Sequence, residues 1–273
     1  MNVSVRIREI EEQKIGVSGR QVLLVEGGDD VLAFKQLLTK AALGWEKDWV
    51  VESAGGKKQV LEILAQKLDW IGVVDRDEWS DGVITNKLQE LSNLWVLPRF
   101  CIENYLIVPE ELWRAFPPTQ QQKVSGEYST LESALLENIE QWVAHGVLWS
   151  VINPLWEGLR TKGFKEELLD LEVALDQQRI EEKLKEWHQY LDPDQLLQQF
   201  NNRLEEVRQL TVEAHLKQWI HGKKFYERIV HPNLNRLLGQ KAKTDRKRAI
   251  WRTMEVPADL SPLWKKMGVG VNQ

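Results

Sequence analysis

The sequence predicts an α/β protein, with a parallel sheet flanked by helices and a mainly α-helical C-terminal region. Short apolar runs rich in Val and Ile have the pattern of strands that are covered on both faces. Such strands are expected at residues 21–25, 49–53, 70–74 and 94–97. Helical spacing fills the first two gaps, at residues 29–42 and 55–68. Because strands and helices alternate, we expect right-handed crossovers and a parallel sheet.

Each of these two helical segments has its apolar residues on one stripe. The first stripe is made by Val31, Phe34, Leu37 and Leu38, and the second by Val60, Ile63, Leu64 and Leu68. From about residue 110 onward, long segments rich in Leu, Glu, Lys and Gln have helical spacing and almost no strand signal. We therefore predict an N-terminal segment (1–19), an α/β domain (20–110), a helical domain (111–255) and a C-terminal tail (256–273).

Composition is that of an ordinary globular protein. Of 273 residues, 42% are hydrophobic and 28% charged, and the net charge of −5 means that any surface for nucleic acid must be local. The single cysteine excludes a disulfide within the chain and a zinc site built on cysteines. The charged first residues, and the lack of an apolar run of about 18 residues, predict a cytoplasmic protein without a membrane span.

Acidic residues directly follow two of the predicted strands. Glu26 follows the first, and Asp75 and Asp77 follow the third. The carboxyl ends of parallel strands meet at one edge of a sheet, so these acids should lie close together. Two such charges 4 Å apart repel by about 1 kcal/mol in water and about 4 kcal/mol at an effective dielectric constant of 20. A divalent cation would reverse that cost, which predicts a Mg²⁺ or Mn²⁺ site with phosphate as co-ligand.

Simpler roles for the acids near these strands remain open. Asp29 or Asp30 could cap the helix that follows, which is a common role of Asp at that position. The Asp75-x-Asp77 pair is also compatible with turn chemistry. Gly27 and Gly28 allow a sharp turn and a close approach of the backbone to phosphate.

The order of these elements resembles a Toprim domain, a Rossmann-like fold shared by topoisomerases, bacterial primases and the overcoming-lysogenization-defect (OLD) nucleases. The resemblance covers about residues 20–108. It consists of strand–Glu–Gly–helix, Gly-Gly after the second strand, and strand–Asp-x-Asp. The stretch "LPRFCIENYLI" (97–107) is similar to a Toprim-like family of unknown function, which is found beside ATPases in bacterial phage-defence systems.

The resemblance implies specific site residues. OLD nucleases show Glu-x3-Glu/Asp, Asp-x-Asp, Ser-x-Glu and a later Lys. By this resemblance the ligands of two Mg²⁺ or Mn²⁺ ions are Glu26, Asp30, Asp75, Asp77 and Glu103, and the catalytic residues are Glu26, Asp75, Asp77 and Lys223. Cys101 stands where these nucleases have Ser, which leaves its role open. Lys223, in "HGKK", is equally compatible with the end of a helix capped by Gly.

The function implied is that of a metal-dependent endonuclease acting on DNA or RNA, with tRNA among the candidate substrates. The resemblance further implies an anti-phage effector that works with a separate ATPase of the AAA or ABC type. This chain itself has no P-loop motif. The residues distinguish neither DNA from RNA nor a monomer from an oligomer.

A basic stretch near the C-terminus is the candidate nucleic-acid surface. It consists of Lys241, Lys243, Arg246, Lys247 and Arg248, whose alternative role is a solvated helix face. Two other classes of function stay open. One is a non-catalytic nucleic-acid-binding or regulatory subunit with the same fold. The other is a receiver-like phosphotransfer domain, which would need a phosphorylatable Asp after the third strand and a Lys after a fifth.

Overall fold

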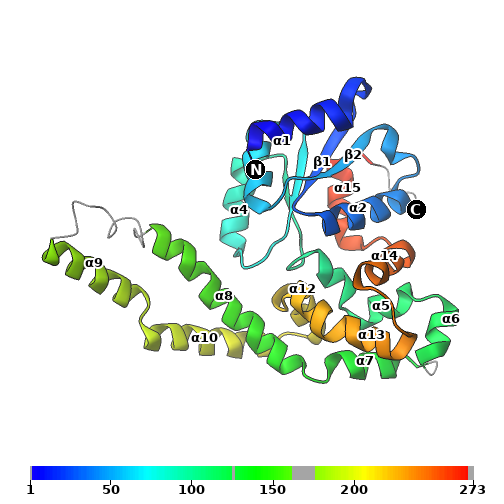
Figure 1. Cartoon of the computed structure of the whole chain (residues 1–273). Coiled ribbons are helices and arrows are strands. Elements are labelled where there is room, and N and C mark those ends of the chain that lie inside the picture. Colours follow the sequence, from blue (N-terminus) through cyan, green and yellow to red (C-terminus); the bar gives the residue numbers. More distant parts are fainter. Residues whose placement is uncertain (1, 125–126, 162–175, 270–273) are drawn as a thin grey trace. The chain divides into compact units, whose positions relative to one another are not determined.

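The computed structural model describes residues 2–124, 127–161 and 176–269 and confirms the α/β class. Four parallel strands form one sheet in the order β2-β1-β3-β4 (Figure 1). They are β1 (Gln21–Val25), β2 (Trp49–Ser53), β3 (Ile71–Val74) and β4 (Leu94–Val96). Each falls on a predicted strand, and β1 and β2 have the predicted bounds. All four carboxyl ends therefore lie along one edge, as the parallel pairing requires.

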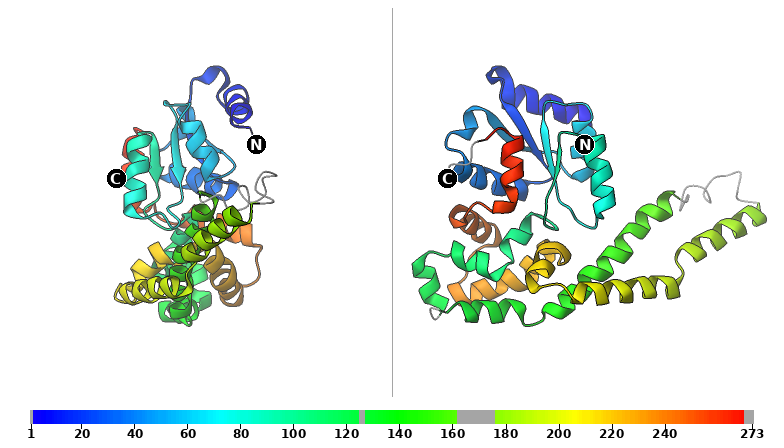
Figure 2. Two further views of the ribbon diagram at one scale, coloured as in Figure 1. Left: turned by 90° about the vertical axis from the view of Figure 1, so that its left-hand side faces the viewer. Right: turned by 180° about the vertical axis from the view of Figure 1, so that it is seen from behind.

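Helices connect consecutive strands and cover both faces of the sheet (Figures 1 and 2). The connections are α2 (Gly28–Ala41), α3 (Lys57–Leu64) and α4 (Asp81–Glu90). On one face, α1 (Val3–Ile10), α3 and α4 pack against a core that includes Val22, Leu24 and Val74. On the other face, Phe34 of α2 contacts Trp264 of α15 (Ser261–Lys266) edge to face, with ring centroids 6.3 Å apart.

The second predicted stripe is shorter than expected. Val60, Ile63 and Leu64 are buried, but Leu68 is 77% exposed. The helix α3 ends at Leu64, so Leu68 lies beyond the last turn and leaves the stripe. The helix packs so closely on the sheet that a Cβ at Gly72 of β3 would lie 2.9 Å from Val60.

The chain forms two compact units, whose limits differ from the predicted segments. One unit comprises Met1–Asn138 and Leu216–Gln273, and the other comprises Ile139–His215. The second unit contains α8 (Ile139–Thr161), α9 (Gln177–Tyr190), α10 (Pro193–Arg208) and α11 (Val212–Ala214). In it Arg203 donates to the Ser150 carbonyl at 3.1 Å, which links α10 to α8.

The first unit includes both predicted end segments. Ile7 and Ile10 place the predicted N-terminal segment in the core of the sheet. The predicted tail contains a 3-10 helix (Ala258–Leu260) and α15, and it buries Leu260, Leu263 and Trp264. The remaining helices of this unit are α5 (Pro109–Ala115), α6 (Pro118–Gln121), α7 (Tyr128–Leu136), α12 (Gly222–Phe225), α13 (His231–Leu238) and α14 (Lys243–Thr253). Residues 216–269 thus return to the sheet. No helix in the described ranges has the length and apolar character to cross a membrane.

The packing of α15 predicts a large loss of stability for Trp264→Ala. Since Trp264 is 1% exposed, its truncation leaves a cavity and should cost about 3–5 kcal/mol of unfolding free energy. Leu68→Ala is the matched control, because an exposed side chain should change stability by no more than about 0.5 kcal/mol. Urea denaturation followed by circular dichroism measures both. Equal stability of the two variants would contradict the packing of α15.

Candidate functional site

The acids that follow β1 and β3 are in direct contact at the carboxyl edge of the sheet. The Oε1 atom of Glu26 accepts a hydrogen bond of 2.8 Å from the backbone N–H of Asp75. Burial raises the pKa of Glu26, the nearby Lys57 ammonium and the Asp75 N–H lower it, and the Asp77 carboxylate raises it again. Two residues 49 positions apart therefore meet because their strands are neighbours in the sheet.

Asp75 forms the centre of the site and is only 2% exposed. Its Oδ1 accepts the backbone N–H of Ile102 at 3.1 Å, and its Oδ2 lies 3.0 Å from Nζ of Lys223. Burial raises the pKa of Asp75, and the Lys223 ammonium opposes that rise. Burial also lowers the pKa of Lys223, but the Asp75 carboxylate more than reverses that fall, so the pKa of Lys223 is raised. We take the pair as ionised, because the ammonium and the donated N–H both favour the carboxylate.

Asp77 has a left-handed backbone, with φ of 49°, and it is the one non-glycine residue with positive φ in the described ranges. Its N–H donates to the carbonyl of Phe100 at 2.8 Å, and its Oδ2 lies 2.6 Å from Nζ of Lys57. The Lys57 ammonium also lies 4.4 Å from the ring centroid of Trp79. Asp tolerates this conformation better than most residues, and such backbone outliers cluster at functional sites. Lys57 was not among the residues predicted for the site, although its place directly after Gly-Gly at a helix start was a usable signal.

Asp30 faces the same edge and also supports the start of α2. Its Oδ2 accepts the backbone N–H of Gly27 at 2.7 Å, which is the reciprocal half of a capping box. The capping role considered from sequence is thus present at Asp30, whereas Asp29 pairs with Lys247 at 2.7 Å. Burial raises the pKa of Asp30 to about 7, opposed by the Gly27 N–H and Lys223 and assisted by Glu103 and Glu26.

Glu103 is 2% exposed and lies in the 3-10 helix Ile102–Leu106, which follows β4. Its Oε1 is 3.0 Å from Nζ of Lys247 on α14. Its Oε2 is buried and has no hydrogen-bond partner among the described residues. A buried carboxylate oxygen left in this state is suited to accept from a ligand.

Two residues of the predicted basic surface, Arg246 and Lys247, are buried, with 5% and 7% of their surface exposed. On α14 these two side chains point inward with Ile250 and Trp251, because each finds a polar partner there. Arg246 donates to Asn235 and to the carbonyl of Gly239, and Lys247 binds the two acids described above. The remaining three predicted residues are exposed: Lys241, Lys243, which pairs with Glu227, and Arg248, which pairs with Asp245.

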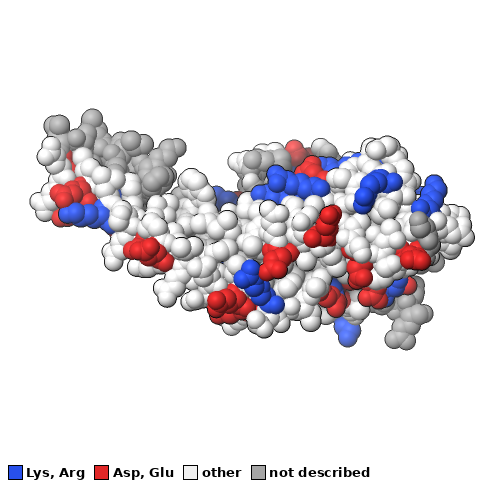
Figure 3. All heavy atoms as spheres, turned by 90° about the horizontal axis from the view of Figure 1, so that it is seen from below, with Lys and Arg blue, Asp and Glu red and all other residues white. Residues whose placement is uncertain are grey.

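Surface charge on one further face of the molecule is mixed. On the face drawn in Figure 3, lysine and arginine side chains lie singly or in small groups beside acidic ones.

The surroundings of Cys101 are those of a residue that contributes to packing. It is fully buried, and its thiol lies 3.0 Å from Oδ1 of Asn104. Burial raises the pKa of Cys101 well above its ordinary value, with Glu103 and Asp75 adding to that effect, so the thiol stays neutral. The small-buried-residue role considered from sequence fits this position.

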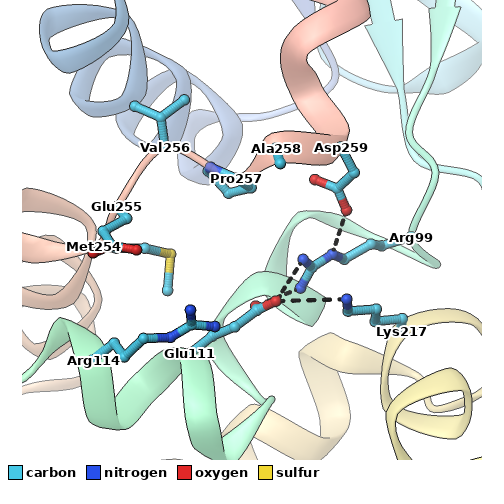
Figure 4. A pocket seen from close by; sticks show the side chains of 10 residues that line it. All are labelled: Arg99, Glu111, Arg114, Lys217, Met254, Glu255, Val256, Pro257, Ala258 and Asp259. Carbon is cyan, nitrogen blue, oxygen red and sulfur yellow. Dashed lines mark hydrogen bonds and ion pairs between the residues drawn. The ribbon is translucent and has the colours of Figure 1, made fainter. Parts of the chain in front are cut away.

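A cavity of about 590 Å³ opens beside Glu26, Asp30 and Glu103, and neither Asp75 nor Asp77 is among the residues that line it. Its lining consists of Glu26, Gly27, Gly28, Asp29, Asp30, Gly55, Gly56, Glu103, Lys223, Tyr226, Glu227, Lys243 and Lys247. Acids and lysines thus share one concave surface with two glycine pairs. A second cavity of about 350 Å³ has Arg99 between Glu111 and Asp259 (Figure 4), so its most buried charge is already neutralised.

The donor set of the first cavity suits a hard divalent cation, because all of its acidic ligands offer oxygen. Within the described part of the chain, however, no group of three or more Asp, Glu, His or Cys side chains is arranged to hold a metal ion. Instead Asp75, Asp77 and Glu103 each face a lysine ammonium. The residues fit Mg²⁺ or Mn²⁺ by donor type, and a bound cation would compete with those lysines for the same oxygens.

Comparison with known protein families, curated proteins and solved structures finds no match to this chain. The Toprim and OLD resemblance therefore stays a hypothesis.

The raised pKa of Asp30 predicts a pH dependence of stability. The pKa of Asp30 in the folded protein, about 7, exceeds the ordinary Asp value of 3.8, so between these two pH values the native state binds more protons than the unfolded state. The unfolding free energy should therefore fall as the pH rises through this range. Asp30→Asn keeps the acceptor for Gly27 but cannot titrate, and it should gain stability over the wild type by roughly 1–4 kcal/mol as the pH rises. Urea denaturation in EDTA measures this, and parallel pH profiles of the two proteins would contradict it.

The burial of Lys247 predicts that its loss is costly. Lys247→Met leaves Glu103 buried without its cation and should lower the unfolding free energy by about 3–5 kcal/mol. The double variant Lys247→Met/Glu103→Gln should recover most of that loss, since no buried charge then remains unpaired. Arg248→Met, on the exposed side of α14, is the control and should be nearly neutral. A Lys247→Met protein as stable as this control would show that the pair is not buried as described.

Proposed function

We propose that the protein is a nuclease that hydrolyses phosphodiester bonds in DNA or RNA with Mg²⁺ or Mn²⁺. The observation that supports this is the contact of Glu26 with Asp75, and of Asp75 with Lys223, at the carboxyl edge of a parallel sheet. This edge is where ligands of open α/β sheets bind. The cavity beside it offers both acids for a cation and lysines for a phosphate.

The charge pattern explains why a phosphodiester suits this cavity. Acids alone would repel an anionic substrate, but Lys223, Lys243 and Lys247 line the same wall. Gly27 and Gly28 at the start of α2 leave room for a phosphate oxygen to approach the backbone.

In this proposal Glu26, Asp75 and Asp77 would hold one divalent cation, and Asp30 and Glu103 would hold a second or orient water. When bound, such cations stabilise negative charge and lower the pKa of a coordinated water. The Oε2 atom of Glu103, which has no hydrogen-bond partner among the described residues, is consistent with a ligand that binds on that side of the cavity.

The chain's own residues would orient the substrate and move protons. The Lys223 ammonium, held by Asp75, can neutralise charge that develops on the phosphate in the transition state. If Asp30 orients water and does not bind a cation, its pKa of about 7 lets it give or take a proton near neutral pH. Cys101 has no part in the reaction, because its thiol is buried and neutral.

The biological setting follows from the family resemblance of residues 97–107. On that basis we extend the proposal to an anti-phage effector that works with a separate ATPase and that acts on DNA, or on an RNA such as tRNA. Co-purification with the products of neighbouring genes is the direct way to find such a partner.

The Lys223–Asp75 pair also favours a second candidate, a receiver-like phosphotransfer domain, because such a domain needs a lysine beside its phosphorylatable Asp. The described sheet has four strands, however, and Lys223 follows helices rather than a fifth strand. Incubation with acetyl phosphate and intact-mass analysis separates the two. A phosphoryl adduct lost in Asp75→Asn would favour phosphotransfer.

The nuclease proposal predicts metal-dependent cleavage. Plasmid, single-stranded DNA and tRNA are incubated with Mg²⁺ or Mn²⁺, with and without EDTA, and the products are separated on gels. EDTA and Asp75→Asn should each abolish cleavage, and Lys223→Ala should lower kcat by about 100- to 1,000-fold, the usual loss when one stabilising group is removed.

Asp81→Asn is the matched control, because Asp81 is an exposed acid on α4 paired with Arg76. It should cleave like the wild type. Cleavage that survives EDTA would contradict the metal role. The alternative is a non-catalytic subunit. It would be favoured if neither the wild type nor a folded Glu26→Ala protein cleaves nucleic acid and both bind it equally well.

A further inference from the structure

Asn104 is buried between the site and the returning C-terminal segment. It is 0% exposed and lies in the 3-10 helix Ile102–Leu106. Its side-chain Nδ2 donates to the carbonyls of Leu216 at 2.6 Å and Ile220 at 2.9 Å. These carbonyls lie in and just after the π-helical turn His215–Trp219, where a helix end leaves acceptors to be satisfied.

The other atoms of Asn104 attach it to the sheet edge. Its Oδ1 accepts the backbone N–H of Cys101 at 3.0 Å, and its carbonyl accepts from Arg99 at 3.2 Å. Arg99 is in turn held by Glu111 and Asp259, as Figure 4 shows. The N–H of Ile102, two residues earlier, donates to Asp75. One short segment therefore holds Asp75 on one side and residues 216–220 on the other.

Gly222 brings this contact close to the catalytic lysine. A Cβ at Gly222 would overlap the Asn104 side chain and lie 2.9 Å from the Asn104 backbone nitrogen. Glycine is thus needed here for close approach. The next residue is Lys223, whose Nζ lies 3.0 Å from Asp75.

The chemistry of the contact fits asparagine and few other residues. One side-chain nitrogen must donate twice while the oxygen beside it accepts, which an amide does and a carboxylate does not. Gln would carry an additional methylene into the space that Gly222 fills. Ser is too short to reach both carbonyls.

We infer that Asn104 is a positioning residue, which fixes the turn before Gly222 and thereby holds the Lys223 ammonium on Asp75. This inference extends the proposed function, in which Lys223 acts on the substrate phosphate. The positioning itself can be tested without any substrate.

The first measurement is competitive acetylation of lysines with acetic anhydride, quantified by mass spectrometry. Lys58, whose side chain is 82% exposed and lies 3.7 Å from Glu62 at the surface, is the internal reference for an exposed lysine. In the wild type Lys223 should react several-fold more slowly than Lys58, because it is bound to Asp75. Asn104→Asp, which keeps the shape but loses both donated hydrogen bonds, should raise the Lys223 rate several-fold and leave that of Lys247 unchanged.

Two further variants are a second way to release Lys223 and a matched control. Gly222→Ala should release Lys223 in the same way, because the added methyl group pushes against Asn104. Cys101→Ser is the matched control, since it changes a buried neighbour of the same Oδ1 but can still donate to it, and its Lys223 rate should equal that of the wild type.

The second measurement is cleavage. Asn104→Asp should lower kcat with little change in KM, and Asn104→Asp/Lys223→Ala should be no worse than Lys223→Ala, because both changes remove one and the same interaction. If the wild type cleaves nothing, the nuclease proposal fails, and acetylation still decides the positioning role. An unchanged Lys223 rate in folded Asn104→Asp would overturn the inference. The inference would also be overturned if the acetylation rates of both Lys223 and Lys247 rose in both Asn104→Asp and Gly222→Ala. Asn104 would then support the whole fold and not the position of Lys223 in particular.

Discussion

Pairing of buried acids with lysines from distant segments is the constraint on which the rest of this structure depends. Asp75 and Glu103 are almost fully buried at the strand ends, and a buried carboxylate without a partner costs several kcal/mol. Their partners, Lys223 and Lys247, lie on α12 and α14, 148 and 144 residues away in sequence from these acids. The segment 216–269 must therefore return to the sheet, and its apolar residues around Trp264 provide the packing that holds it there.

The same pairing makes the site suitable for ligand exchange. An ion pair of this kind adds little to stability compared with an apolar replacement, so its presence needs another explanation. Under the nuclease proposal, a lysine ammonium that is paired with one of these acids would turn to a phosphate when a cation takes over that acid. Asp77 supports this view, since it combines a left-handed backbone with an ion pair to Lys57, and such strain is retained where surrounding contacts enforce it.

Local patterns in the sequence predicted the sheet well, and long-range pairing limited the rest. The continuous Val-rich runs at β1 and β2 have no competing helical pattern, so their bounds were predictable. Leu68 was predicted to be buried because it continues the helical spacing of its neighbours, but the helix ends at Leu64. Arg246 and Lys247 belong to a basic run that resembles a solvated face, and nothing near them in sequence indicates that Glu103 and Asn235 turn them inward. Asn104 was missed for the same reason, because Leu216 and Ile220 are remote in sequence.

The contacts of residues 99–104 show how the fold and the site depend on one another. Arg99 joins Glu111 on α5 to Asp259 in the C-terminal segment and also binds the Asn104 carbonyl. Ile102 and Asn104 then hold Asp75 and the turn before Lys223. Because these residues lie in one short segment, a shift of α5 or of the C-terminal segment would reach Asp75 and Lys223 together. These hydrogen bonds connect the buried acid Asp75 to a lysine on the four-residue helix α12.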